Sequence, residues 1–156
     1  MRGRAVASAL CLVALLYCTY RPRSQERGDS ILLERGPCFG TCPVYSVLLR
    51  ADGTARFVGH ENAQLRGEWV GTFEPGLFLE LLKMMRDAGF WSLQDRYERP
   101  VTDNATAIVA VLHGSAALKR VSNYASAGPL ALAGVESAID LVAARCDWKP
   151  VSSTEH

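Results

Sequence analysis

Short segments rich in strand-forming residues follow one another along this chain, separated by turn signals. In several of these segments apolar and polar residues alternate. Runs of this kind, rich in β-branched and aromatic residues, predict strands. Between two of them, Ala51-Asp52-Gly53 is a tight-turn signal, because glycine takes a positive φ without steric cost. The two flanking strands are therefore predicted to form a hairpin. The predicted strands are 31–35, 43–50, 54–60, 65–73, 105–112 and 118–124.

Two other stretches carry apolar residues at helical spacing. The first begins at Pro75, which suits a first helical turn, and ends at Gly89, which suits a C-terminal cap. The second begins after Gly128-Pro129. Because strands joined by short connections pair antiparallel, we predict an α+β fold. It consists of an antiparallel β-sheet of about five to six strands with two helices packed on one face.

The strand predicted at 65–73 has an unusual face, on which large apolar residues alternate with glycines. Leu65, Gly67, Trp69, Gly71 and Phe73 share this face. Glycine within a strand often marks a close approach of another part of the chain. We therefore expect this face to pack tightly against a neighbouring backbone.

The N-terminus has the pattern of an export signal. Arg2 and Arg4 precede an apolar run at 5–16, which is shorter than the ~20 residues of a spanning helix. We expect 1–20 to be a signal peptide or N-terminal anchor, 21–29 a linker, 30–150 a single α+β domain and 151–156 a tail. Cys18 lies where a lipoprotein carries its lipid, but Tyr17 stands where such signals have a small residue. Cleavage, lipidation and retention as a membrane tether all stay open.

Composition and charge narrow the classes of partner and reaction. The formal net charge is +1 over 156 residues, without the basic excess that nucleic-acid binding requires. The chain has neither a phosphate-binding glycine loop nor a Gly-x-Ser-x-Gly nucleophile turn. We therefore predict no cofactor and no catalytic residues, and an enzyme is less expected than a binding protein of the periplasm or cell envelope.

The sharpest local motif is Cys38-x-x-x-Cys42-Pro43. One interpretation is a disulfide that fixes a turn, with Cys146 as an alternative partner, in an oxidising compartment. The other is a copper, zinc or thiol-redox site, with His60 completing a metal-ligand set. The motif precedes a strand, so it lacks the helix N-terminus that lowers the pKa of a thiol. This context favours the disulfide.

A polar loop between the first helix and the strand at 105–112 gathers Asp95, Tyr97, Thr102 and Asp103. Loops carry function more often than cores do, and two carboxylates could serve a small hydrolase or a ligand site. The competing interpretation is local: Asp103 is a good turn former, and Tyr97 covers the core. The aromatic residues of the chain are in general interpreted as core.

A resemblance to a known family rests on Cys38-Phe39-Gly40-Thr41-Cys42-Pro43-Val44-Tyr45-Ser46-Val47, followed by Asp52-Gly53. This stretch resembles the bacterial domain of unknown function 6438 family, as do Asp95-x-Tyr97, Thr102-Asp103, and Tyr124 with Pro129. The resemblance spans about Ile31 to Trp148. Its members are small proteins, often with signal peptides or lipoprotein signals, found in bacterial envelopes. The family implies no activity and supplies no catalytic residues.

These observations lead to two hypotheses from different classes. The first is an exported, non-enzymatic module that binds an envelope protein or a surface component. The alternative is a metal-binding (copper or zinc) or thiol-redox accessory protein that uses Cys38 and Cys42, with His60 as a weak third ligand.

Overall fold

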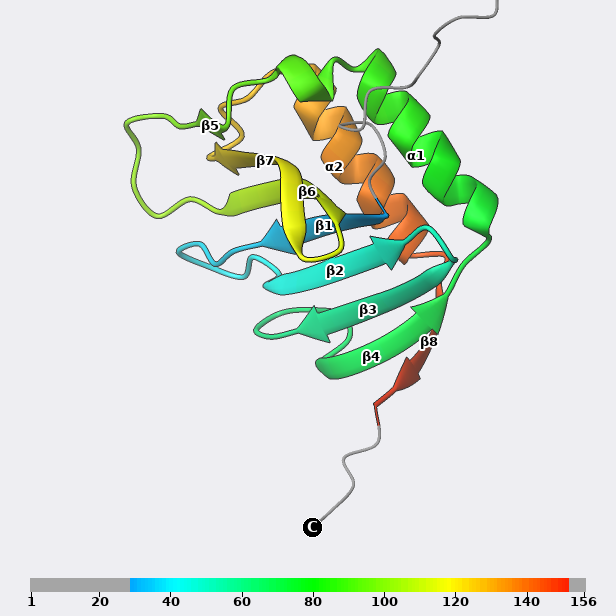
Figure 1. Ribbon diagram of the computed structural model, residues 1–156. Helices are drawn as coiled ribbons and strands as arrows, with labels where there is room; N and C mark the ends of the chain where they lie inside the picture. Colours follow the sequence, from blue (N-terminus) through cyan, green and yellow to red (C-terminus); the bar gives the residue numbers. More distant parts are fainter. Residues whose placement is uncertain (1–28, 152–156) are drawn as a thin grey trace, which may run out of the picture.

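A mixed eight-stranded sheet forms the centre of the computed structural model, which describes residues 29–151 (Figure 1). The order of strands is β5-β7-β6-β1-β2-β3-β4-β8. The strands are β1 (Ser30–Arg35), β2 (Tyr45–Arg50), β3 (Thr54–Gly59), β4 (Gly67–Thr72), β5 (Arg96–Tyr97), β6 (Thr106–His113), β7 (Ala116–Tyr124) and β8 (Asp147–Pro150). The helices are α1 (Pro75–Asp87), the 3₁₀ turn η2 (Phe90–Ser92) and α2 (Leu130–Ala143).

The predicted α+β fold with two helices is confirmed, but the predicted five to six strands are too few. The two missed strands, β5 and β8, form the two edges of the sheet. β5 has only two residues and lies within the predicted polar loop, and β8 contains charged residues and a proline. Neither segment is long enough to display a period of two. β5 also pairs parallel with β7, so the sheet is not entirely antiparallel.

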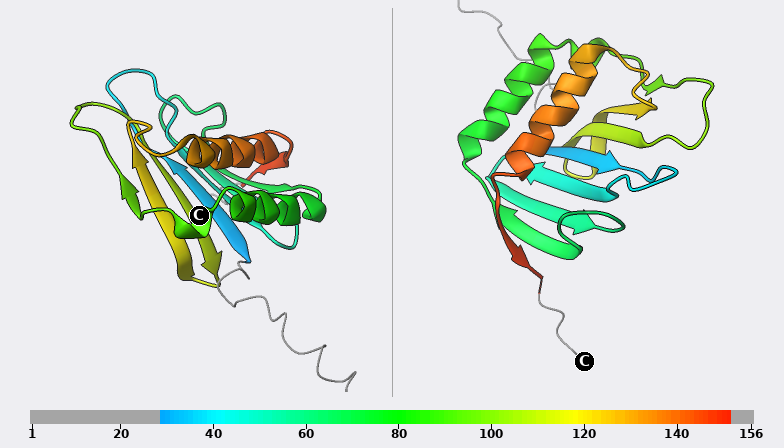
Figure 2. Two further views of the ribbon diagram at one scale, coloured as in Figure 1. Left: turned by 90° about the horizontal axis from the view of Figure 1, so that it is seen from above. Right: turned by 180° about the vertical axis from the view of Figure 1, so that it is seen from behind.

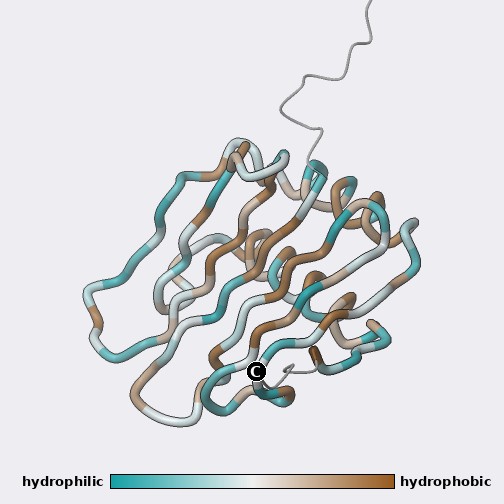
Figure 3. Tube along the Cα trace, turned by 60° about the horizontal axis from the view of Figure 1, so that its bottom comes forward, coloured by the Kyte–Doolittle hydropathy of each residue, from teal (hydrophilic) through white to brown (hydrophobic). Residues whose placement is uncertain are grey.

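The helices α1 and α2 lie side by side on one face of the sheet (Figure 2). Apolar residues of both helices face inward, among them Phe78 and Met85 of α1 and Ile139 of α2, all fully buried. They pack against Ile31, Leu33, Val47, Leu49, Val109, Val111 and Val121 of the sheet. Figure 3 shows hydrophobic segments along the central strands and hydrophilic loops around them. Each large apolar side chain buried in this layer contributes about 1.5–3 kcal/mol.

The ends of α1 follow from its sequence. Pro75 is the first helical residue, where its missing N–H costs no hydrogen bond. After the cap at Ala88, Gly89 has a left-handed φ of 69°, which ends the helix as predicted. The chain then turns back, and Phe90 in η2 is fully buried in the core.

Two glycines allow other groups to approach the strands β3 and β4 closely. A Cβ atom at Gly59 would overlap the carbonyl oxygen of Leu65, so the β3–β4 loop folds tightly over the end of β3. A Cβ atom at Gly71 would come within 2.5 Å of Cε3 of Trp148, so the indole ring lies directly on the backbone of β4. Close packing was predicted for this face of β4, but the neighbour at Gly71 is a side chain.

Several predictions concern segments outside the described residues. The signal peptide or anchor at 1–20, the linker up to residue 28 and the tail from residue 152 belong to this group. In the part of the chain that the structure does describe, neither α-helix combines the length and apolar character needed to cross a membrane.

The role of Gly59 can be tested by comparing two Gly→Ala substitutions. Gly59→Ala should lower the free energy of unfolding by about 1–3 kcal/mol or more, because the new methyl group collides with the backbone at Leu65. At Gly134 in α2, a new Cβ atom meets nothing but the helix's own backbone within 4 Å. Gly134→Ala should therefore raise the free energy of unfolding by about 0.5–1 kcal/mol. Denaturant unfolding of both variants measures the difference. Equal changes in the free energy of unfolding for the two variants would show that the β3–β4 loop does not pack closely against Gly59.

Candidate functional site

Four loops gather at one end of the sheet, which we call the loop end. They are the β1–β2 loop (36–44), the β3–β4 loop (60–66), the β5–β6 loop (98–105) and the β7–α2 connection (125–129). The strand registers place them together, because Arg35 at the end of β1 pairs with both Tyr45 and Ala107. Figures 1 and 2 show these loops on the same side of the molecule. Asp29, the first described residue, precedes β1 at the opposite end of the sheet.

A disulfide between Cys38 and Cys42 closes the β1–β2 loop, with the two Cα atoms 5.7 Å apart. This separation lies within the usual range for a disulfide. The backbone N–H of Phe39 donates to the carbonyl oxygen of Asp103 over 2.9 Å, and Nδ2 of Asn62 donates to that of Cys42 over 3.3 Å. The cysteine loop is thereby tied to the loops on both sides.

Phe39 lies in the cysteine loop, and it departs from the general interpretation of the aromatic residues as core. Its side chain is 89% exposed. The ring is thus available at the surface of the loop end.

In the described part of the chain, neither the alternative cysteine partner nor the candidate third metal ligand makes a side-chain hydrogen bond to the cysteine loop. Cys146 follows α2 as a free, half-buried thiol that donates to the carbonyl oxygen of Val142, and burial raises its pKa to about 11. His60 has an exposed side chain, and its backbone N–H bonds to Val44 near the cysteine loop. Within residues 29–151, no three histidine, cysteine or acidic side chains gather as a metal site.

The residues of the predicted polar loop make mainly local contacts. Asp95 accepts a hydrogen bond from Nζ of Lys119 over 2.6 Å, and the hydroxyl of Tyr97 accepts one from the backbone N–H of Gln94. The carbonyl oxygen of Thr102 accepts one from the Asn104 side chain, and Asp103 has a left-handed φ of 62°. Asp95 and Asp103 line separate hollows, so the structure does not bring these two carboxylates to one pocket.

A polar network beneath α2 was not predicted. At the end of β1, Arg35 donates from Nη2 and Nε to Oδ2 of Asp140, over 2.6 and 3.2 Å. The hydroxyl of Tyr45 donates to Oδ1 of the same carboxylate over 2.5 Å. Nη1 of Arg35 lies 3.6 Å from Oε2 of Glu136, whose Oε1 accepts from Nδ2 of buried Asn123 over 2.8 Å. One cation thus contacts two carboxylates that stand four residues apart on one face of α2.

Burial and hydrogen bonding fix the protonation of this network. Burial, together with the hydrogen bond to Asp140, raises the pKa of Tyr45 to about 12. Burial opposes the charge of Arg35, but the hydrogen bond and the negative charge of Asp140 outweigh it and raise the pKa of Arg35. At neutral pH the network therefore holds a guanidinium cation and a neutral phenol that donates its proton.

A hollow of about 610 Å³ lies beside this network, between the C-terminal half of α2, the sheet and the β3–β4 loop. We call it the aromatic pocket. Phe57 stacks on Tyr45 with ring centroids 5.1 Å apart, and Trp148 meets Phe57 edge-on at 5.7 Å. Its volume lies within the range of about 300–1,000 Å³ that is typical of ligand sites. The lining residues are Pro43, Tyr45, Phe57, Asn62, Gln64, Leu65, Asp140, Ala143, Ala144 and Trp148.

The sequence explains why the aromatic pocket is open. Ala143 and Ala144 have short side chains, so the end of α2 leaves space above Phe57 and Trp148. Trp148 is held in place by a hydrogen bond from its Nε1 to the carbonyl oxygen of Ala143 over 2.9 Å, and by its contact with Gly71. Trp148 is thus positioned by its contacts with α2 and β4.

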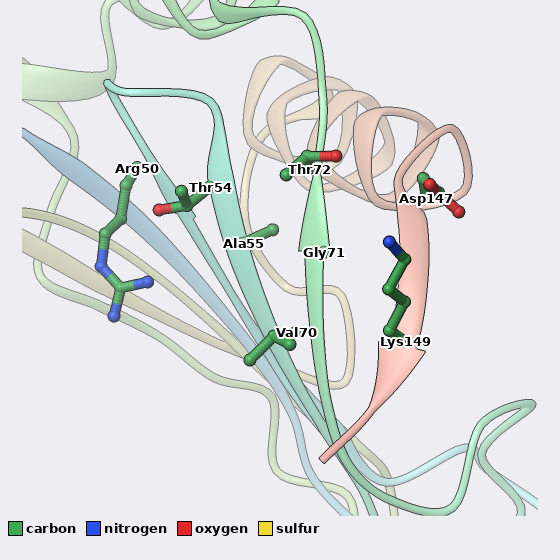
Figure 4. Close-up of a pocket in the computed structure, with 8 residues that line it drawn as sticks. All are labelled: Arg50, Thr54, Ala55, Val70, Gly71, Thr72, Asp147 and Lys149. Carbon is green, nitrogen blue, oxygen red and sulfur yellow. The ribbon is translucent and has the colours of Figure 1, made fainter. Parts of the chain in front are cut away.

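A second hollow, of about 350 Å³, crosses β2, β3, β4 and β8 (Figure 4). Alternation along the strands places its residues Thr72 and Lys149 on the sheet face opposite Gly71 and Trp148. Its lining contains no aromatic side chain. The aromatic pocket is larger and contains organised polar groups, and it is therefore the stronger candidate for a ligand site.

The network can be tested through its pH dependence. Because the pKa of Tyr45 is raised above its ordinary value of 10.0, the stabilising contribution of Tyr45 is present below that pH and is lost as pH rises toward about 12. Tyr45→Phe should lower the free energy of unfolding by about 1–2 kcal/mol at neutral pH and should remove this alkaline loss. Unfolding measured from neutral to alkaline pH tests both effects. Tyr97→Phe, outside the network, is the control, and an identical profile for both variants would contradict the assignment.

The disulfide is expected to order the loop more than it stabilises the fold. Cys38→Ala/Cys42→Ala should lower the free energy of unfolding by only about 2 kcal/mol or less, because the closed loop is short. Amide hydrogen exchange at Phe39 should accelerate, since its bond to Asp103 depends on the loop geometry. Cys146→Ala should leave that exchange rate unchanged. Global unfolding of the double variant would show that the bridge stabilises the whole fold.

Comparison with known proteins identifies a family without an assigned function. No curated protein matches this chain. The family model described as "Domain of unknown function (DUF6438)" matches residues 29–143, from the residue before β1 to the end of α2. The match covers well over half of the chain and agrees with the family named from the sequence. This chain belongs to the DUF6438 family of domains of unknown function.

Proposed function

We propose that this protein is an exported, non-enzymatic binding module of the bacterial cell envelope, and that it takes its ligand in the aromatic pocket. The observation that supports this proposal is the pairing of aromatic walls with a fixed polar network. Tyr45 belongs to both, because its ring stacks on Phe57 while its hydroxyl bonds to Asp140. An apolar pocket with a few convergent polar groups is the usual form of a small-molecule site.

The pocket requires little rearrangement before it can bind a ligand. Tyr45 and Asp140 hold each other in place, and Trp148 is fixed by Ala143 and Gly71. Groups that are already ordered lose less conformational entropy when a ligand binds, and this improves affinity. The pocket is therefore better suited to recognition than an equally large hollow between flexible side chains.

The chemistry of the pocket favours binding over catalysis. A general acid or base works best when its pKa lies near the working pH. The pKa of Tyr45 is about 12, and Asp140 is engaged by Arg35 at 2.6 Å. Tyr45 is therefore not poised to transfer a proton at neutral pH, and Asp140 is occupied by its ion pair.

Export is supported by the N-terminal pattern and by the cysteine chemistry. The bond between Cys38 and Cys42 is compatible with an oxidising compartment, where such bonds persist.

The metal-binding or thiol-redox alternative stays a prediction. Metal binding requires Cys38 and Cys42 as thiolates, whereas the structure joins them in a bridge, which is the oxidised state of a thiol-redox pair. The contacts of this loop with Asp103 and Asn62 support an architectural role. The binding proposal therefore rests on the aromatic pocket and does not depend on the cysteines.

A fragment experiment tests the binding proposal. We expect small uncharged fragments, screened by protein-observed NMR, to shift the indole N–H signal of Trp148. Ala144→Phe should abolish these shifts, because the new ring fills the pocket from an exposed position. Ala131→Phe, on an exposed site at the other end of α2, is the matched control. Fragment shifts that survive Ala144→Phe, or no hits at all, would refute the aromatic pocket as the binding site.

A further inference from the structure

The charge balance of the aromatic pocket restricts the class of its ligand. Asp140 is the only acidic side chain in its lining, and no basic side chain lines it. Asp140 is paired with Arg35, which donates two hydrogen bonds to Oδ2 and also lies 3.6 Å from Glu136. Tyr45 donates its proton to Oδ1 and is neutral at physiological pH. The one charged side chain in the lining thus already has a cationic partner.

Charged ligands fit this environment poorly. An anion would meet the carboxylate of Asp140 and the nearby Glu136, with no free cation in the lining to bind it. An organic cation could lie over the aromatic rings. It would, however, have to share Asp140 with the guanidinium of Arg35, which is held at 2.6 Å. A neutral ligand is not repelled by the carboxylates and does not compete with Arg35 for Asp140.

The polar atoms that remain are suited to hydroxyl groups. Oδ1 of Asp140 accepts one hydrogen bond, from Tyr45, and a carboxylate oxygen has two acceptor sites. The exposed amides of Asn62 and Gln64, on the opposite loop, offer both donors and acceptors. A ligand hydroxyl group can donate a hydrogen bond to Oδ1 of Asp140, and other hydroxyl groups can pair with the two amides. The pocket also contains aromatic rings, so the ligand must offer an apolar face to them as well as hydroxyl groups to Asp140, Asn62 and Gln64.

We propose that the aromatic pocket binds a pyranose unit of a neutral saccharide. The C–H face of the sugar ring packs on the aromatic wall, where weakly positive hydrogens meet the negative ring face. One hydroxyl donates to Oδ1 of Asp140, and others pair with the amides of Asn62 and Gln64. This inference rests on the proposed binding function and gives that function a ligand class. The same chemistry serves a free sugar or one unit of a glycan chain.

Titration with defined probes tests this inference. The saccharide probes are the methyl pyranosides of glucose, galactose and N-acetylglucosamine, together with cellotetraose and chitotetraose. Benzyltrimethylammonium and benzoate represent cationic and anionic aromatic ligands. Binding is followed by the indole signal of Trp148 in NMR and by calorimetry. We expect at least one saccharide to bind more tightly than both charged probes.

Variants show whether a saccharide occupies the predicted position. Gln64→Ala should weaken saccharide binding about fivefold, the effect of losing one hydrogen bond. Gln94→Ala, an exposed amide outside the pocket, should leave it unchanged. Ala144→Phe should abolish binding. Tighter binding of a tetrasaccharide than of its monomer would assign the ligand to a glycan chain, and equal affinities would assign it to a single sugar unit.

The outcomes distinguish failure of the saccharide assignment from failure of the proposed binding function. If uncharged fragments bind at Trp148 and no saccharide does, the saccharide assignment is wrong and the binding module stands, whether or not benzyltrimethylammonium binds. If neither the saccharides nor the uncharged fragments bind at Trp148, both fail. Saccharide binding that persists in Ala144→Phe would place the site elsewhere and overturn the assignment.

Discussion

The contact between Arg35 and Asp140 joins the centre of the sheet to the helix that covers it. Arg35 ends β1, the strand paired on both sides with β2 and β6, and Asp140 lies on α2. Two hydrogen bonds from Arg35 to Oδ2 of Asp140 help to fix how α2 crosses the strands, because a partly buried cation must remain close to its carboxylates. The position of α2 in turn decides where Ala143 and Ala144 lie above the aromatic rings. The pocket is a consequence of this crossing.

Much of the fold could be predicted because its signals are local. The turn at Asp52-Gly53, the helix start at Pro75 and the helix end at Gly89 each depend on neighbouring residues only. The edge strands β5 and β8 could not, because two to four residues carry no period and their pairing is decided by distant strands. The exposure of Phe39 could not be predicted from its hydrophobicity, which by itself favours burial.

The candidate site was largely invisible in the sequence. Its aromatic rings come from β2, β3 and β8, and its carboxylate from α2. A weak signal did exist: Glu136 and Asp140 interrupt an apolar helical stripe at a spacing of four, which places two carboxylates near the sheet. Their partner Arg35 could be identified only from the strand order, since it lies about a hundred residues earlier. The cysteine loop, which is the sharpest motif in the sequence, contributes only Pro43 to the lining of this site.

The position of Trp148 in the chain has a consequence for assembly. β1 can pair with β2 as soon as the first hairpin exists, but its other neighbour, β6, is made much later. Such distant pairing slows folding, because a long loop must close before the contact forms. Trp148 lies later still, in the edge strand β8, which joins the sheet through β4 alone. The pocket is therefore completed only when almost the whole chain has emerged, and a chain shortened by ten residues at its C-terminus would lack one wall.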